Sequence, residues 1–211
     1  MTVPDAAIRE AVRIIRTGGV IAFATETYYG LGVDPFNREA LARLFAIKGR
    51  QQLKPILVLV SDRSQIDRLA ASVPPSYLSV MDRFWPGPLT LVFPARADVP
   101  GLLTGNTGTV GIRQSPHPGA ARLLDCLGAP LTATSANRSG AAPASTAAEV
   151  EAVFGHDVDL VLDHGPTPGN LPSTLVGERN GRLVCLREGA IPFSRLQDKG
   201  GLRPPGRPSP G

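Results

Sequence analysis

Polar side chains of the kinds that bind anions and small polar molecules recur along the chain, next to apolar runs. Residues 25–32, TETYYGLG, follow the apolar run 20–24 and combine hydroxyls, a carboxylate and two glycines that let a ligand approach the backbone. Lys48, Arg50 and Lys54 follow, and they include two of the three lysines in a chain with nineteen arginines. Ammonium groups beside a guanidinium suit a triphosphate. The plainer alternatives are a structural turn for the first segment and a cation-stabilised helix end for the second.

Four further polar segments lie at or near the ends of predicted strands. Arg113 ends the run 109–113 and suits a carboxylate or a phosphate, although a surface salt bridge is the commoner fate of such an arginine. Residues 132–140, TATSANRSG, are rich in hydroxyls and amides. Residues 172–174 and 187–189 complete the set, and a hydrophilic loop or an ordinary strand end remains the alternative for each.

Several familiar catalytic motifs are absent from the sequence. There is no GxxxxGK[ST], no complete GxGxxG, no GxSxG and no HExxH, so P-loop, Rossmann, serine-hydrolase and zincin chemistry are not indicated. Cys126 and Cys185 are isolated from each other and from histidines, and the three histidines are scattered. The sequence therefore predicts neither a covalent nucleophile nor a metal site built from side chains.

The elements that must position these residues alternate between helices and strands. A helix is predicted to end before Gly18, a second begins after its cap Asn37, and Thr146 with Glu149 forms a capping box that opens another. Further helices are predicted from about residue 63, after the prolines at 74 and 75, and over 120–127. The predicted strands are 20–24, 56–60, 89–93, 109–112, 131–134, 159–162, 174–176 and 182–187.

This order predicts an α/β fold with a twisted mixed parallel and antiparallel sheet, flanking helices and a basic concave cleft. The last two strands form a hairpin, because Asn180-Gly181 suits a type I′ turn. In α/β sheets ligands bind where loops leave the strand ends, which is where the polar segments lie. We expect one domain over residues 1–196 and a disordered Pro/Gly-rich tail over 197–211.

The amino-acid composition limits which kinds of partner the protein is expected to bind. Hydrophobic residues make up 42% and charged residues 19% of the 211, so the chain can bury a real core. The net charge is +4, but +3 of it lies from Arg195 onward, which weakens a nucleic-acid interpretation. No apolar run approaches the length of a membrane span, so no membrane partner is expected. The isolated cysteines and the absence of a leader-like start favour the cytoplasm.

Seven segments in order resemble the YrdC/Sua5 family of threonylcarbamoyl-AMP synthases in its short single-domain form. They are ATETYYGLG (24–32), KGR (48–50), FWPGPLTLV (84–92), GIR (111–113), SANRSG (135–140), PSTLV (172–176) and LREGAI (186–191). The resemblance runs from about residue 18 to residue 191. It implies a reaction in which L-threonine, bicarbonate and ATP give threonylcarbamoyl-AMP and pyrophosphate for the t6A modification of tRNA position 37.

The resemblance also implies roles for residues at matching positions. The expected threonine contacts are Thr27, Arg113, Ala133 and Ser173. Arg50 and Lys54 are expected to hold the triphosphate, and Lys48 and Arg50 to act in catalysis as pyrophosphate leaves. Thr109, Ser135, Asn137, Pro143 and Arg187 are expected around the nucleotide. Mg²⁺ is expected to bind through the phosphates, with no metal site of protein ligands.

Three positions depart from the family's usual pattern. Ala24 and Gln51 stand where proline is common, and Leu59 replaces a histidine that some relatives use beside threonine. The amino-acid pocket is therefore expected to differ in shape. The second domain of longer relatives is not present in this sequence.

Two other functions stay open on the sequence alone. One is a non-catalytic double-stranded RNA or tRNA-binding module of the same fold, with contact to tRNA or a t6A transferase complex as the related partner hypothesis. The other is a sister nucleotide-binding branch with a different acceptor, suggested by Leu59 and Gln51. If the chain is a synthase, we expect loss of Lys48 or Arg50 to lower turnover with little loss of stability, because charged loop residues contribute more to phosphate positioning than to the core.

Overall fold

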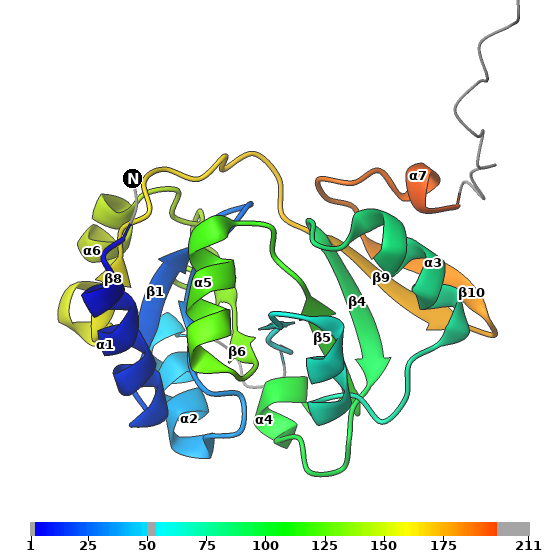
Figure 1. Cartoon of the computed structure of the whole chain (residues 1–211), viewed down its shortest axis with the longest axis horizontal. Helices are drawn as coiled ribbons and strands as arrows, with labels where there is room; N and C mark the ends of the chain where they lie inside the picture. Colours follow the sequence, from blue (N-terminus) through cyan, green and yellow to red (C-terminus); the bar gives the residue numbers. More distant parts are fainter. Residues whose placement is uncertain (1–2, 50–53, 198–211) are drawn as a thin grey trace, which may run out of the picture.

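The computed structural model describes residues 3–49 and 54–197, and their strands form two sheets (Figure 1). One sheet has the order β7-β2-β1-β8, and the other has the order β10-β9-β4-β5-β3-β6. The first contains β1 (Ile21–Ala24), β2 (Tyr29–Gly32), β7 (Thr134–Ser135) and β8 (Leu160–Leu162). The second contains β3 (Val58–Leu59), β4 (Leu89–Pro94), β5 (Thr109–Arg113), β6 (Leu131–Thr132), β9 (Thr174–Arg179) and β10 (Arg182–Arg187).

Both sheets mix parallel and antiparallel pairs, as expected. In the first, β1 pairs antiparallel with β2 and parallel with β8. In the second, β4 pairs antiparallel with β5 and parallel with β9, while β9 and β10 form the predicted antiparallel hairpin around Asn180 and Gly181, both at positive φ. The α/β class and the mixed pairing are therefore confirmed, and the strands are divided between two sheets.

Helices flank the sheets. They are α1 (Asp5–Arg16), α2 (Arg38–Lys48), α3 (Pro75–Phe84), α4 (Gly101–Thr104), α5 (Pro118–Leu127), α6 (Ala147–Phe154) and α7 (Phe193–Gln197), with 3₁₀ turns η1 (Arg63–Arg68) and η2 (Gly155–Asp157). The Asn37 side chain accepts from the backbone N–H of Glu39 and Ala40 (3.1 and 3.0 Å), so α2 begins as predicted. In Figure 1, α1, α2, α5 and α6 gather around the first sheet, and α3 lies over β4, β9 and β10.

Several elements differ from the prediction. Residues 29–32 form strand β2 rather than a loop, and the helix expected near residue 63 is the 3₁₀ turn η1. The strand predicted over 131–134 is two strands in different sheets. The N–H of Ala133 between them donates to Leu57 O at 2.9 Å, so the chain passes from one sheet to the other at this residue. Helices α4 and α7 have too few residues to produce a periodic signal.

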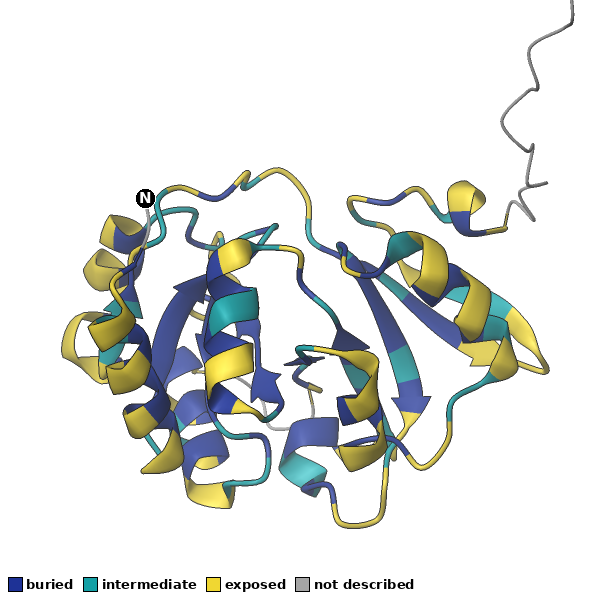
Figure 2. Cartoon of the chain, viewed as in Figure 1, coloured by how far each residue is buried: buried dark blue, intermediate teal, exposed yellow. Residues whose placement is uncertain are grey.

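The core consists of two hydrophobic clusters. The smaller lies where α1 and α5 pack on the first sheet, and the larger continues through the second sheet to α3. Figure 2 shows most of the strands as buried, the edge strand β10 as partly or fully exposed, and the outer faces of the helices as exposed. Trp85 is buried and donates from Nε1 to Leu89 O at 2.7 Å, so it anchors the turn before β4. In the described part of the chain, no helix is long and apolar enough to cross a membrane. The tail predicted over 197–211 lies, apart from Gln197, outside the described residues and stays a prediction.

Candidate functional site

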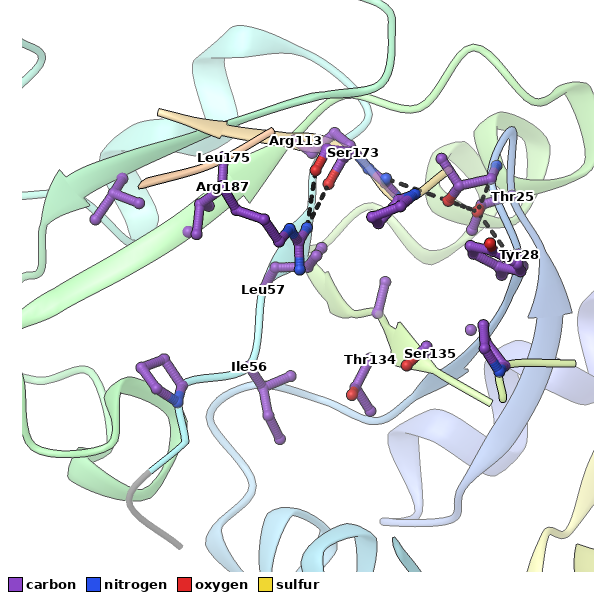
Figure 3. A pocket seen from close by; sticks show the side chains of 18 of the residues that line it. Thr25, Tyr28, Ile56, Leu57, Arg113, Thr134, Ser135, Ser173, Leu175 and Arg187 are labelled. Atoms are coloured by element: carbon purple, nitrogen blue, oxygen red, sulfur yellow. Dashed lines mark hydrogen bonds between the residues drawn. The ribbon is translucent and has the colours of Figure 1, made fainter. Parts of the chain in front are cut away.

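A cavity of about 550 Å³ lies between the two sheets, and residues from both line it. The lining comes from the β1–β2 turn, the segment before β3, strand β5, the crossing at residues 133–135 and the ends of β9 and β10. In Figure 3, Ser173, Thr25 and Tyr28 lie around one part of the cavity, with Ile56, Thr134 and Ser135 across from them. Because strand ends of both sheets meet at this cavity, polar side chains from both sheets lie in one site.

Arg113 ends β5 and is 3% exposed. Its Nη1 lies 3.0 Å from Oε1 of Glu26 and donates to Oγ1 of Thr27 at 3.5 Å. Burial lowers the pKa of Arg113, and the charge of Glu26 opposes that shift. Nε is buried and has no hydrogen-bond partner in the described part of the chain. The guanidinium therefore keeps unused hydrogen-bonding capacity beside the cavity, which suits a carboxylate.

The turn between β1 and β2 is braced by its own hydroxyls. Thr25 Oγ1 donates to the carbonyl of Tyr28 at 2.7 Å and lies 3.0 Å from Oγ1 of Thr27. At the start of β2, the Tyr29 hydroxyl donates to Gly165 O at 2.8 Å, and burial raises its pKa to about 12. These bonds fix the Thr27 hydroxyl at the cavity wall.

Ser173 and Arg187 form another part of the cavity wall. Arg187 Nη2 donates to Ser173 O at 2.8 Å, and the Ser173 hydroxyl lies 2.8 Å from Oγ1 of the buried Thr90. Burial lowers the pKa of Arg187. Gly189 packs on this turn so closely that a Cβ there would lie 2.3 Å from Pro172 O. The wall is therefore held by side-chain bonds and by one close backbone contact.

Lys48, expected to face the triphosphate, is buried at the end of α2 and is 2% exposed. Its Nζ donates to Ser135 O in a very short contact and to Asn137 O at 2.7 Å. The Asn137 side chain accepts from Ser135 Oγ at 2.5 Å and donates to the carbonyls of Arg138 and Ala141. Lys48 and Asn137 thus support the loop that carries Ser135 to the cavity. Lys48 was grouped with charged loop residues, but it is the last residue of α2 and is buried.

Apolar side chains form another part of the lining. They are Ile56, Leu57, Val92, Leu175 and Leu186. Leu186 is 54% exposed at the rim. The sequence gives no sign that these residues belong to a site, because each lies in an apolar run typical of a buried strand.

Of the residues expected in a site, eight line the cavity. They are Thr27, Thr109, Arg113, Ala133, Ser135, Pro143, Ser173 and Arg187. Lys48 and Asn137 lie beneath the loop, Lys54 is exposed next to the lining residue Pro55, and Arg50 lies outside the described residues. Leu59 is fully buried in the smaller hydrophobic cluster. The Glu26–Arg113 ion pair was missed, because the two residues are 87 positions apart in the sequence and no local spacing links them.

Within the described ranges, no three His, Cys, Asp or Glu residues are grouped as metal ligands. The two charged side chains of the cavity lining are the arginines at 113 and 187. This lining favours an anionic ligand over direct coordination of a cation.

Comparison with known proteins gives one consistent family. The Sua5/YciO/YrdC family model, described as telomere recombination, matches residues 13–189. A Coxiella burnetii protein named threonylcarbamoyl-AMP synthase is 39% identical over 85% of this chain and 96% of its own length. A Pyrococcus abyssi protein of the same name is 35% identical over 90% of this chain, which spans only 56% of that longer protein.

Solved structures agree in fold. The crystal structure of Pyrococcus abyssi Sua5 with L-threonine has a TM-score of 0.89 and 34% identity, and the match covers 93% of this chain and 58% of that one. The Escherichia coli YciO structure has a TM-score of 0.82 and 26% identity, covering 92% of this chain and 94% of that one.

Proposed function

The chain belongs to the Sua5/YciO/YrdC family, and on that premise we propose that it is a threonylcarbamoyl-AMP synthase. The reaction joins L-threonine, bicarbonate and ATP into threonylcarbamoyl-AMP and releases pyrophosphate. Its product is the activated intermediate for t6A in tRNA, and we place the reaction in the cytoplasm.

One observation carries the proposal beyond the family: eight residues expected around threonine and the nucleotide line a single cavity. They come from five separate parts of the chain and from both sheets. A reaction among three small molecules needs this convergence, because holding reactants together removes much of the entropic barrier.

Threonine binds on the side of Arg113. The guanidinium binds the carboxylate, and the hydroxyls of Thr27 and Ser173 complete the contacts. Ala133 contributes its carbonyl, because its N–H already donates to Leu57 O. The burial of Arg113 strengthens the interaction, since a charge pair gains more where water is excluded.

ATP binds across the cavity from threonine. Thr109, Ser135, Pro143 and Arg187 surround the nucleotide, and the apolar wall covers its base. Arg50 and Lys54 hold the triphosphate. Asn137 and Lys48 act from beneath, where they shape the loop of Ser135 and place a positive charge near it.

The chemistry requires positioning more than a nucleophilic side chain. The neutral amine of threonine and bicarbonate condense to a carbamate with loss of one water, which carries away the amine proton. A carbamate oxygen then bonds to the α-phosphorus while the bond from that phosphorus to pyrophosphate breaks. Cations stabilise the charge that develops on the leaving group, which is the role of Lys48 and Arg50. Binding in the cavity between the two sheets limits the contact of the carbamate with water, in which it readily loses CO₂.

Mg²⁺ arrives with the phosphates of ATP. The described cavity lining holds no carboxylate, and Mg²⁺ commonly binds substrate phosphates and waters with few protein ligands. It supplies charge neutralisation on the phosphates during the transfer.

The test supplies the protein with ¹⁴C-bicarbonate, ATP, Mg²⁺ and L-threonine and follows pyrophosphate and labelled adenylate. We expect both products to require threonine. Equal ATP turnover with serine, or with no amino acid, would instead indicate a different acceptor. Salt-sensitive tRNA binding with no adenylate formed, unchanged in Arg113→Ala, would indicate an RNA-binding module.

A further inference from the structure

Glu26 is paired with Arg113 but does not itself line the cavity. Glu26 follows β1, and its side chain is 12% exposed, against 4% for the Arg113 side chain. The described lining includes Arg113 and the neighbouring Thr27 but not Glu26. Glu26 can therefore affect a bound ligand through Arg113.

The two carboxylate oxygens of Glu26 face different residues, and Oε1 forms its ion pair without hydrogen-bond geometry. Oε1 lies 3.0 Å from Arg113 Nη1, and Oε2 accepts a very short hydrogen bond from Ser115 Oγ. Ser115 is 4% exposed, and its Oγ in turn accepts from the backbone N–H of His117 at 3.2 Å. His117 caps α5, so a helix anchors the chain of contacts that ends on the guanidinium.

The contacts of Arg113 leave one edge of the guanidinium available. Glu26 and Thr27 both lie against Nη1. Among the described residues, Nε is buried without a hydrogen-bond partner and Nη2 makes no hydrogen bond. A carboxylate binds an arginine best when two parallel N–H groups face it, and Nε and Nη2 form such an edge.

We infer that Glu26 is a positioning residue, held by Ser115, that keeps the Nε and Nη2 edge of Arg113 turned toward the carboxylate of the amino-acid substrate. The inference rests on the proposed function. Glu26 also supplies the counter-charge that lets a guanidinium stay ionised when the cavity is empty, since an isolated buried charge is strongly disfavoured. Glutamine would fill the same space without this charge.

The experiment compares Glu26→Gln, Glu26→Asp and Ser115→Ala with the wild type in threonine-dependent pyrophosphate release. We expect Glu26→Gln to raise KM for L-threonine about tenfold or more, with KM for ATP within about twofold. Glu26→Asp keeps the charge and should recover part of the loss. Ser115→Ala removes the hydrogen bond to Glu26 and the acceptor of the His117 N–H while leaving Glu26 and Arg113 in place, and it should raise the threonine KM about threefold. A structural ion pair alone would not separate the two KM values.

Asp159→Asn is the matched control, because it breaks the Arg43–Asp159 ion pair at 2.6 Å outside the cavity. It should lower stability and leave both KM values unchanged. A Glu26→Gln enzyme with an unchanged or lower threonine KM would overturn the inference. If that variant does not fold, an unchanged threonine KM in Ser115→Ala overturns it. A wild type without threonine-dependent pyrophosphate would overturn the proposed function as well.

Discussion

At the scale of single residues, the shape of the guanidinium at position 113 matters as much as its charge. Arg113→Lys keeps a cation but loses the planar pair of donors, and the shorter reach of the ammonium leaves Glu26 less well paired. We expect KM for L-threonine to rise about 10- to 100-fold, which corresponds to loss of one charged hydrogen bond. Steady-state pyrophosphate release at saturating ATP measures this.

Arg43→Lys provides the comparison for Arg113→Lys. Arg43 also pairs with a carboxylate, Asp159, but at a site outside the cavity. Its substitution should leave the threonine KM unchanged. Equal KM values for Arg113→Lys and the wild type would contradict the assignment of the carboxylate to Arg113.

Lys48 affects stability as well as catalysis. Lys48→Met keeps the apolar stem but removes the ammonium from the carbonyls of Ser135 and Asn137. Carbonyls left without a donor cost about 1–3 kcal/mol when buried, so we expect the free energy of unfolding to fall by about that amount. Urea unfolding followed by circular dichroism measures it.

This expectation differs from the one based on sequence, which treated Lys48 as a charged loop residue. Lys54→Met is the comparison, because Lys54 is exposed and its substitution should change stability by less than about 0.5 kcal/mol. Identical unfolding midpoints for Lys48→Met and the wild type would show that the ammonium has no structural role.

At the scale of elements, the turn before β9 depends on one glycine. Gly189→Ala would place a Cβ 2.3 Å from Pro172 O and 2.5 Å from the carbonyl carbon of Ser173. Both neighbours are backbone, so the turn must shift and carry Ser173 and Arg187 with it. We expect at least a tenfold loss of kcat/KM and a lower unfolding midpoint.

Gly177→Ala separates a local clash from a general loss of glycine. At Gly177 the nearest atom is Cδ1 of the flexible Leu186 side chain at 3.2 Å, so a rotamer change relieves the contact. Its activity should stay within about twofold of the wild type. Full activity in Gly189→Ala would mean that this turn does not position the site.

The same scale explains what sequence could predict. The ends of α2 and α6 were predictable, because Asn37 and Thr146 cap them through local hydrogen bonds. Strand β2 was not, because its glycines and tyrosines are also typical of a ligand-binding turn. The eight cavity residues were found through motif resemblance, whereas the Glu26–Arg113 pair depends on the β1–β2 turn meeting the end of β5, which no local pattern encodes.

At the scale of the whole molecule, the division into two sheets creates the cavity. The sequence predicts alternating helices and strands. It does not predict that the chain passes from the second sheet to the first at Ala133, between β6 and β7. Its N–H donates to Leu57 O in register with the β3–β6 pairing, and the next residue, Thr134, already pairs with β2 of the first sheet. Such a choice depends on contacts distant in sequence, so hydrophobic periodicity predicts the strands without predicting how they are shared between sheets.

Stability of the whole fold should depend on pH through two histidines. His117 and His164 stack edge to face with ring centroids 5.6 Å apart, and burial lowers the pKa of both. Below about pH 6.5 the unfolded chain binds more protons at these positions than the folded protein does. The free energy of unfolding should therefore be at its plateau above pH 6.5 and fall as the pH decreases through the folded pKa values.

Urea unfolding at pH 7.5 and pH 5.5 tests this, in a range above the titration of ordinary carboxylates. His164→Gln should narrow the difference in free energy of unfolding between the two pH values, because only one buried histidine with a lowered pKa then remains in the folded protein. His156→Gln is the control, since His156 is exposed and makes no contact with the pair. An unchanged pH dependence of the free energy of unfolding in His164→Gln, equal to that of His156→Gln and the wild type, would contradict the prediction. It would show that the His117–His164 pair does not cause the loss of stability at pH 5.5.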